Sequence, residues 1–140
     1  MSFPRSFLVI YSTSSWSIET AGWRCEDDQG SIAFIPCDAD GEAALILGTF
    51  RKDAGVVTDD ELRQMSARGA PSDAPREFVT CGEFRGVGTR FVQDGVAWRV
   101  WWLGGDSIHI YATFTCEPGA IGSHDAVVEW MLSQLRVVRA

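Results

Sequence analysis

The dipeptide Asp94-Gly95 constrains the fold of this chain most, because it separates two long segments in which apolar and polar residues alternate. Asp-Gly is a strong signal for a two-residue β-turn of the primed type, in which both turn residues take positive φ. Closing the chain at this turn sets Phe91 opposite Trp98. Residues 87–103 are therefore predicted to form an antiparallel hairpin.

The next turn is predicted at Gly104-Gly105-Asp106, and its length decides which side chains of residues 107–116 face the core. A three-residue loop pairs Trp102 with Ile108 and gathers the apolar side chains on one face, whereas a two-residue loop mixes polar and apolar residues on both faces. The predicted core face consists of Phe91, Trp98, Val100, Trp102, Ile108, Ile110, Ala112, Phe114 and Cys116. The predicted opposite face carries Arg90, Arg99, Trp101, His109, Tyr111, Thr113 and Thr115.

Helical patterns flank this β-rich segment. Residues 58–69 begin with Thr58 and Glu61 at capping-box spacing, and residues 123–137 carry a broad apolar stripe after Ser123 as the expected N-cap. Further strands are predicted at residues 7–12, 22–26, 31–37 and 43–51, with a hairpin turn at Asp40-Gly41. The 140 residues are predicted to form a single α+β domain, residues 1–140, in which an antiparallel sheet of about six strands is flanked by helices.

The charge balance excludes one class of partner. The formal net charge is −7, and such an acidic chain repels phosphate backbones, so we expect no nucleic-acid binding. The apolar stretch at residues 7–11 is too short for a signal-peptide core or a membrane span. We therefore expect a cytoplasmic protein with no membrane insertion.

The residues that usually carry catalysis or metal binding are few and scattered. Free thiols are the expected state of the cysteines, and a disulfide framework is the alternative. Cys116 and His109 are seven residues apart on one strand and face opposite ways, whereas the spacing leaves open a pair between Cys81 and His124. Two histidines without a nearby cysteine cluster do not make a zinc site. The sequence predicts no catalytic residue, no cofactor and no metal. The cysteines are Cys25, Cys37, Cys81 and Cys116.

The outer face of the predicted hairpin is the one candidate site. Two directly opposed arginines, Arg90 and Arg99, are expected to cost up to about 1 kcal/mol unless an anionic group relieves them. Exposed aromatic side chains beside arginine have the composition of binding hot spots. The alternative is that a helix covers this face and its carboxylates pair with the arginines. The candidate partner-binding residues are Arg90, Arg99, Trp101, His109 and Tyr111.

The order of elements resembles that of the PsbP-like superfamily, which contains an extrinsic subunit of photosystem II and a Ran-binding nuclear import factor. Residues 82–118, followed by a helix ending in MLSQLRV, resemble the closing hairpins and last helix of that family, and TDDELRQM resembles its mid-chain helix. The resemblance implies an α/β/α sandwich. It also implies a binding or adaptor role, since family members include chaperones for secreted effectors.

From these features we expect a non-catalytic protein-interaction module, such as an adaptor, an effector chaperone or an immunity-type protein. Its partner is expected to be another protein, acidic if it binds the arginines, and the chain itself a monomer or a homodimer. The first alternative is a small-molecule binding domain with a pocket between the sheet and a helix. The second is a thiol-dependent enzyme around Cys81.

Overall fold

The structure is a computed structural model that describes residues 10–36 and 43–138. Cys37 and the turn predicted at Asp40-Gly41 lie outside these ranges. Within them, seven strands form an antiparallel sheet, called the large sheet, in the order β3-β4-β5-β9-β8-β7-β6. These strands are β3 (Arg24–Asp28), β4 (Ser31–Ile35), β5 (Ala44–Arg51), β6 (Arg76–Cys81), β7 (Phe84–Gln93), β8 (Val96–Gly105) and β9 (Ile108–Cys116).

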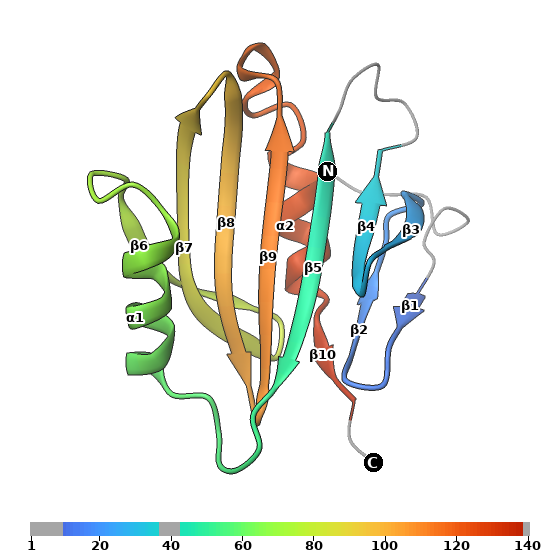
Figure 1. The fold of residues 1–140 in the computed structure, drawn as a ribbon. Helices are drawn as coiled ribbons and strands as arrows, with labels where there is room; N and C mark the ends of the chain where they lie inside the picture. The colour runs from blue at the N-terminus through green and yellow to red at the C-terminus, as the bar shows by residue number, and fades with distance from the viewer. Residues whose placement is uncertain (1–9, 37–42, 139–140) are drawn as a thin grey trace.

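A second, small sheet, two α-helices and the short 3-10 helix η2 (Pro118–Ala120) complete the fold of the described residues (Figure 1). The small sheet has the order β1-β2-β10, and neither β2 nor β10 is predicted from the sequence. The helices cover opposite faces of the large sheet, so the α+β class with an antiparallel sheet flanked by helices is confirmed. The bounds are β1 (Ile10–Ser12), β2 (Trp16–Glu19), β10 (Arg136–Val137), α1 (Asp59–Gly69) and α2 (Asp125–Ser133).

The first predicted hairpin is confirmed. Asp94 and Gly95 have φ values of 53° and 74°, as a primed two-residue turn requires. Strands β7 and β8 pair in the predicted register, with Phe91 opposite Trp98 and Arg90 opposite Arg99. The stacked rings of Phe91 and Trp98 have centroids 6.1 Å apart.

The second predicted turn is wrong. Strand β8 runs on through both glycines, Gly105 pairs with Ile108, and the turn is Asp106-Ser107. The glycines serve packing rather than the turn, because a Cβ at Gly104 would lie 2.8 Å from Val57 and one at Gly105 would lie 2.9 Å from the ring of Phe84. Close approach of other side chains from both faces therefore requires glycine inside the strand.

This register moves the side chains of β9 to the other face from the one predicted. Trp102 lies opposite Tyr111 rather than beside Ile108, and Trp101 lies opposite Ala112. The predicted core face is therefore divided between the two faces of the large sheet. Its first part stays on the α1 face: Phe91, Trp98, Val100 and Trp102. Its second part lies on the α2 face, together with Trp101: Ile108, Ile110, Ala112, Phe114 and Cys116.

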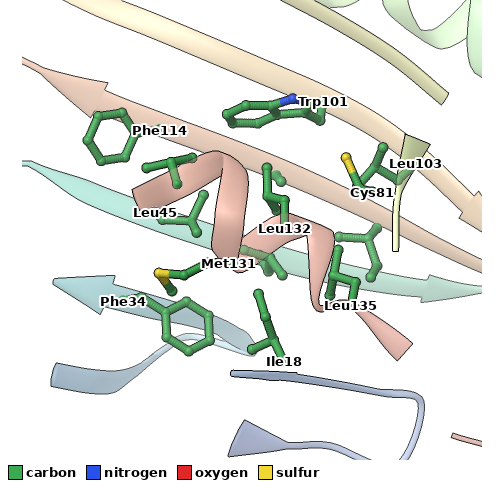
Figure 2. Packing of buried hydrophobic residues seen from close by; sticks show 14 of the residues in the cluster. Ile18, Phe34, Leu45, Cys81, Trp101, Leu103, Phe114, Met131, Leu132 and Leu135 are labelled. Carbon is green, nitrogen blue, oxygen red and sulfur yellow. The ribbon is translucent and has the colours of Figure 1, made fainter. Parts of the chain in front are cut away.

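The main core lies between the large sheet on one side and α2 with the small sheet on the other. Figure 2 shows Trp101 and Phe114 of the sheet facing Met131 and Leu132 of α2, with Ile18 of the small sheet across the same core. The smaller core under α1 gathers Val57, Leu62, Val87, Val100 and Trp102.

The N-cap residues predicted from the sequence locate the start of α1 more accurately than the start of α2. The capping box is confirmed: the Glu61 amide donates to the Thr58 hydroxyl and the Glu61 carboxylate accepts from the Thr58 amide. Helix α2 begins one residue later than Ser123 predicts, because the N-cap is His124, whose side chain makes no capping hydrogen bond.

Arg76 ties the loop between α1 and β6 to the end of the helix. Its guanidinium donates to the carbonyls of Ser66 and Ala70 at 2.7 and 3.1 Å, and to those of Pro71 and Ala74 at 2.6 and 2.8 Å. The Ser66 carbonyl belongs to the last turn of α1, where carbonyls lack helical partners. This loop therefore holds the C-terminal end of α1 beside the start of β6.

Candidate functional site

The five residues predicted to form one surface lie on two faces of the large sheet. Arg90, Arg99 and Trp101 lie on the α2 face, whereas His109 and Tyr111 lie on the α1 face. The turn between β8 and β9 has two residues instead of the predicted three. Compared with the prediction, the pairing of β9 with β8 is shifted by an odd number of residues, so every side chain of β9 lies on the opposite face. The five side chains therefore share no common surface.

Helix α2 neutralises the arginine pair. Asp125 accepts from Arg90 at 3.3 Å and from Arg99 at 3.2 Å, and Glu129 accepts from Arg99 at 3.1 Å. The Arg99 guanidinium also lies 4.8 Å from the ring of Trp101, which is only 5% exposed. The alternative stated from the sequence, a covering helix whose carboxylates pair with the arginines, is confirmed, and the basis for expecting an acidic partner is lost.

A cavity of about 490 Å³ remains beside these residues, between β6, β7, β8 and α2; its walls include Cys81, Arg99, Trp101 and Glu129. Its charged groups are largely engaged, since Arg99 pairs with Glu129 and Asp125. Burial raises the pKa of the Cys81 thiol to about 11. Arg99 lowers this pKa and Glu129 raises it, each by a smaller amount. A thiol of this kind is mostly protonated at neutral pH and a poor nucleophile.

The pair of Cys81 and His124, left open by the sequence, is not brought together. Gly82, the residue after Cys81, lies against the backbone of Leu135 just beyond the C-terminal end of α2, whereas His124 is the N-cap of that helix. Nine helical residues at about 1.5 Å each separate the two ends. The His124 ring instead lies 5.9 Å from Trp23 and 5.8 Å from Phe114.

The α1 face of the large sheet carries a second opening, called here the α1 cleft, with a volume of about 520 Å³. It lies where α1 and the segment before it approach the paired ends of β5, β9 and β8. Its walls are predominantly apolar side chains. The lining residues are Phe50, Arg51, Lys52, Val57, Glu61, Met65, Trp102, His109 and Tyr111.

Aromatic rings on three adjacent strands form the sheet side of the α1 cleft. Trp102 lies opposite Tyr111 with ring centroids 5.9 Å apart, and Phe50 lies opposite His109 with centroids 5.8 Å apart. Trp102 is buried beneath α1, whereas Phe50 is 63% exposed. The exposed Met65 faces them from α1. This arrangement offers flat apolar surface that water covers in the absence of a ligand.

His109 brings a polar atom to this apolar wall. The residue is 8% exposed, and its Nε2 has no hydrogen-bond partner among residues 10–36 and 43–138. Burial lowers the pKa of His109, and the smaller opposing effect of Glu61 does not reverse this direction. The imidazole is therefore neutral at physiological pH. A buried polar atom without a partner is costly, and because Nε2 has almost no accessible surface, a molecule in the α1 cleft cannot reach it unless the wall moves.

Two of the three charged residues that line the α1 cleft pair with each other. Lys52 forms an ion pair with Glu61, and its ammonium also donates to the Val56 carbonyl at 3.0 Å. The hydrogen bond from Lys52 is the largest cause of the lowered pKa of Glu61. Arg51 donates to the Ser15 hydroxyl at 3.0 Å, toward the small sheet. The mouth thus presents a neutralised Lys52–Glu61 pair beside the positive charge of Arg51, whose partner is an uncharged hydroxyl.

Sequence reasoning identified two members of the α1 cleft, His109 and Tyr111, but missed Phe50, Met65 and Trp102. The sequence predicts Trp102 in the core, which its burial confirms, but Trp102 also lines the α1 cleft. The signal in the sequence is Phe50 itself, a large apolar residue near the end of the predicted strand 43–51 that is followed by the charged Arg51 and Lys52.

The described residues also bear on metal binding and on membrane crossing. In the part of the chain that the structure describes, no group of three or more His, Cys, Asp or Glu side chains is placed to hold a metal ion. Nor does either described helix have the length and apolar character needed to cross a membrane.

Comparisons with known proteins bear on the fold alone. No protein-family model matches the chain, and no curated protein matches its sequence. The chain is similar to a protein of Bacteroides thetaiotaomicron whose crystal structure was solved at 1.50 Å, with a TM-score of 0.65 and 22% identity. The match covers 89% of this chain and 45% of the other, so the chain spans less than half the length of that relative. Membership of the PsbP-like superfamily stays a prediction.

Proposed function

We propose that this domain is a non-catalytic binding domain that takes a small organic molecule into the α1 cleft. The observation that carries the proposal is the row of aromatic rings on β5, β9 and β8, with Phe50 63% exposed, in the wall of an opening of about 520 Å³. Small-molecule sites have volumes of about 300–1,000 Å³ and combine mostly apolar walls with a few polar groups. The α1 cleft has both properties.

The cavity under α2 supports the proposal less well. Its arginine and carboxylate groups already satisfy one another, and its thiol has a raised pKa of about 11. A nucleophile needs the opposite shift, toward the thiolate. These two features favour a structural role for this side of the molecule and a binding role, without chemistry, for the α1 cleft.

The test compares two exposed phenylalanines. Phe50 is 63% exposed and lines the α1 cleft, whereas Phe78 is 44% exposed on β6 and does not line it. A library of small organic fragments is screened by protein-observed NMR, and dissociation constants are measured for wild type, Phe50→Ala and Phe78→Ala. We expect the fragments that bind to perturb the amides of residues 50–52 and 109–111.

Phe50→Ala is expected to weaken these fragments at least about fivefold, the loss of one aromatic contact surface, whereas Phe78→Ala leaves them unchanged. A screen in which no fragment binds, or in which both variants behave alike, would contradict the proposal. Thermal melts of the two variants test whether either change acts through unfolding. We expect neither to do so, because both side chains are exposed.

A protein-interaction module is the second candidate, favoured by the exposed apolar side chains around the mouth of the same cleft. Phe50, Met65 and Tyr111 together present the kind of surface into which a partner inserts an anchor residue. A purified protein partner that binds wild type and Phe78→Ala equally, and Phe50→Ala more weakly, would favour this candidate. Light scattering tests the expected monomer or homodimer with the same variants.

A further inference from the structure

Strand β6 forms one end of the large sheet, and no described strand pairs with its outer edge (Figure 1). Cys81 and Phe84 flank the two-residue turn between β6 and β7, and residues that flank such a turn form a hydrogen-bonded pair. Bonded and non-bonded pairs alternate along an antiparallel ladder, so Phe78 and Thr80 direct their N–H and C=O groups away from β7. In the part of the chain that the structure describes, no other backbone group bonds to them there.

The two end strands of the large sheet differ in how they are protected against such pairing. Strand β3, at the other end, has the sequence RCEDD, and charged side chains on an edge strand discourage the addition of another strand. Strand β6 has the sequence REFVTC, without proline or lysine. The Arg76 guanidinium donates to four carbonyls at the end of α1 and in the loop that follows it, which leaves Glu77 as the freely exposed charge of β6.

The cavity of about 490 Å³ under α2 lies along this edge, since most residues of β6 line it. The ion pairs in its wall have a structural role, but the space beside β6 is open. Strand β7 contributes only Gly86 and Gly88 opposite Val79 and Glu77, so no side chain of β7 fills this space. The buried Leu132 lines the same cavity from α2. A hollow beside an unpaired edge gives the side chains of an added strand a place to bind.

Charge favours a basic partner residue at Glu77. Its side chain is exposed and takes part in no ion pair among residues 10–36 and 43–138. The other charges on this face of the cavity pair with one another, Arg90 and Arg99 with Asp125, and Arg99 also with Glu129. Opposite charges that face each other across neighbouring strands stabilise the pairing.

A second copy of the chain fits this edge less well. Directly opposed side chains lie on the same face of a sheet, so β6 of a second copy would offer only Glu77, Val79 or Cys81 opposite Glu77. None of these is a cation, and two chains with a net charge of −7 repel each other.

We propose that the edge of β6 binds an extended peptide segment of another protein, which adds to the large sheet as an antiparallel strand. The main-chain groups of Phe78 and Thr80 form the hydrogen bonds of this pairing. A large apolar side chain of the peptide lies opposite Val79 and enters the cavity, and a lysine or arginine lies opposite Glu77. In strand addition, main-chain bonds give affinity and side-chain pockets give specificity. The site is separate from the α1 cleft and is a second binding site of the same domain.

A library of random linear peptides, selected on the wild-type protein, tests the proposal. We expect the selected peptides to share a large apolar residue followed, two positions later, by lysine or arginine, because an antiparallel strand meets Val79 before Glu77. Dissociation constants of a selected peptide are then measured for wild type, Thr80→Pro and Thr80→Val. Proline removes an outward N–H without breaking the β6–β7 ladder, whereas valine keeps the N–H. We expect Thr80→Pro to weaken binding about tenfold or more and Thr80→Val to leave it unchanged.

The charge pair is tested by reversal. Glu77→Lys is expected to weaken the selected peptide about fivefold or more, and a peptide with glutamate in place of its basic residue is expected to bind Glu77→Lys more tightly than wild type. Phe50→Ala, in the α1 cleft, is expected to leave these affinities unchanged. If Thr80→Pro does not fold, amide exchange in wild type gives a second measurement: the amides of Phe78 and Thr80 exchange rapidly in the free protein and slowly in the complex.

A selection that yields no peptide would overturn the proposal, as would selected peptides that all bind Thr80→Pro as tightly as wild type. Amides of Phe78 and Thr80 that stay unprotected in the complex would do the same. A wild-type chain that dimerises, with Thr80→Pro monomeric, would identify a second copy as the occupant and overturn the proposal as well. None of these results bears on the fragments that bind the α1 cleft, because the two sites lie on opposite faces of the large sheet.

Discussion

Trp102 lies directly opposite Tyr111 across β8 and β9, and their ring centroids are 5.9 Å apart. This pairing places His109 and Tyr111 on the α1 face of the large sheet and leaves Trp101, the neighbour of Trp102, under α2. The two adjacent tryptophans thus belong to different layers of the molecule: one lines the α1 cleft and the other fills the main core.

Trp101→Ala is expected to lower the free energy of unfolding by about 3–5 kcal/mol, the range for truncating a large buried side chain. The indole is 5% exposed and is packed in the main core. Phe50→Ala is the matched aromatic truncation at an exposed position and is expected to cost less than about 1 kcal/mol. Urea unfolding measures both. Similar losses in the two variants would show that the burial of Trp101 does not stabilise the fold as described.

Gly69→Ala is expected to destabilise the protein by about 1–3 kcal/mol, as overpacking does. A Cβ at this position would lie 2.4 Å from Cζ2 of Trp102, whose buried ring is packed against Val57 and Leu62 in the smaller core. Helix propensity alone predicts the opposite sign, since alanine in a helix is favoured over glycine by about 1 kcal/mol.

Gly119→Ala is the control for this change, because a Cβ at Gly119 meets no atom within 4 Å. It is expected to change the melting temperature little. A Gly69→Ala variant as stable as wild type would mean that α1 does not lie this close to Trp102.

Asp125→Asn is expected to cost about 1–2 kcal/mol, because it weakens two charge-assisted hydrogen bonds and leaves the opposed Arg90 and Arg99 less compensated. Asp60→Asn provides the control, since Asp60 also lies in the first turn of a helix but pairs with Arg63 on an exposed surface. Asp60→Asn is expected to lower the free energy of unfolding by less than about 1 kcal/mol, the usual value of a surface pair and helix-dipole contact. The free energies of unfolding are measured by urea titration, because urea, unlike guanidinium chloride, does not change the ionic strength. Equal losses would argue against a special role for the Asp125 carboxylate.

His109 is expected to make the stability of the folded protein depend on pH. Burial lowers its pKa in the folded state, whereas the imidazole of the unfolded chain titrates near its ordinary value of 6.5. As the pH falls below about 6.5, the unfolded chain binds a proton that the folded protein does not, so the free energy of unfolding decreases until the pH reaches the lowered folded pKa.

The measurement compares wild type with His109→Gln between pH 7.5 and pH 5. Wild type is expected to lose stability relative to the variant as the pH falls, and carboxylate titrations common to both proteins cancel in the difference. A difference that stays constant across this range would show that the imidazole of His109 is not buried in the neutral form.

Cys81 is expected to resist alkylation in the folded protein. Burial raises its pKa from 9.0 to about 11, so its thiolate fraction at neutral pH is about 100-fold lower than that of an ordinary thiol, and the sulfur is also shielded from the reagent. Peptide mapping after iodoacetamide treatment at pH 7.5 should show slow modification in buffer and rapid modification in urea. Equal modification rates in buffer and in urea would favour the alternative of a thiol-dependent enzyme around Cys81.

The parts of the fold that short-range interactions specify were predictable from the sequence. The Asp94-Gly95 turn and the Thr58–Glu61 capping box each depend on residues no more than three positions apart, and both form as predicted. A turn that requires positive φ and a helix start with two reciprocal hydrogen bonds have few local alternatives. The pairing of β7 with β8 followed from the turn alone.

The position of the α1 cleft could not be predicted from the sequence, because it depends on tertiary contacts. Gly104 and Gly105 suit a turn as well as a crowded strand, and only the approach of Val57 and Phe84 from opposite faces keeps them in β8. That choice sets the face of every residue in β9, because side chains alternate along a strand. The partners of Arg99 on α2 and of His109 on β5 come from segments 26 or more residues away, and no local pattern encodes such contacts.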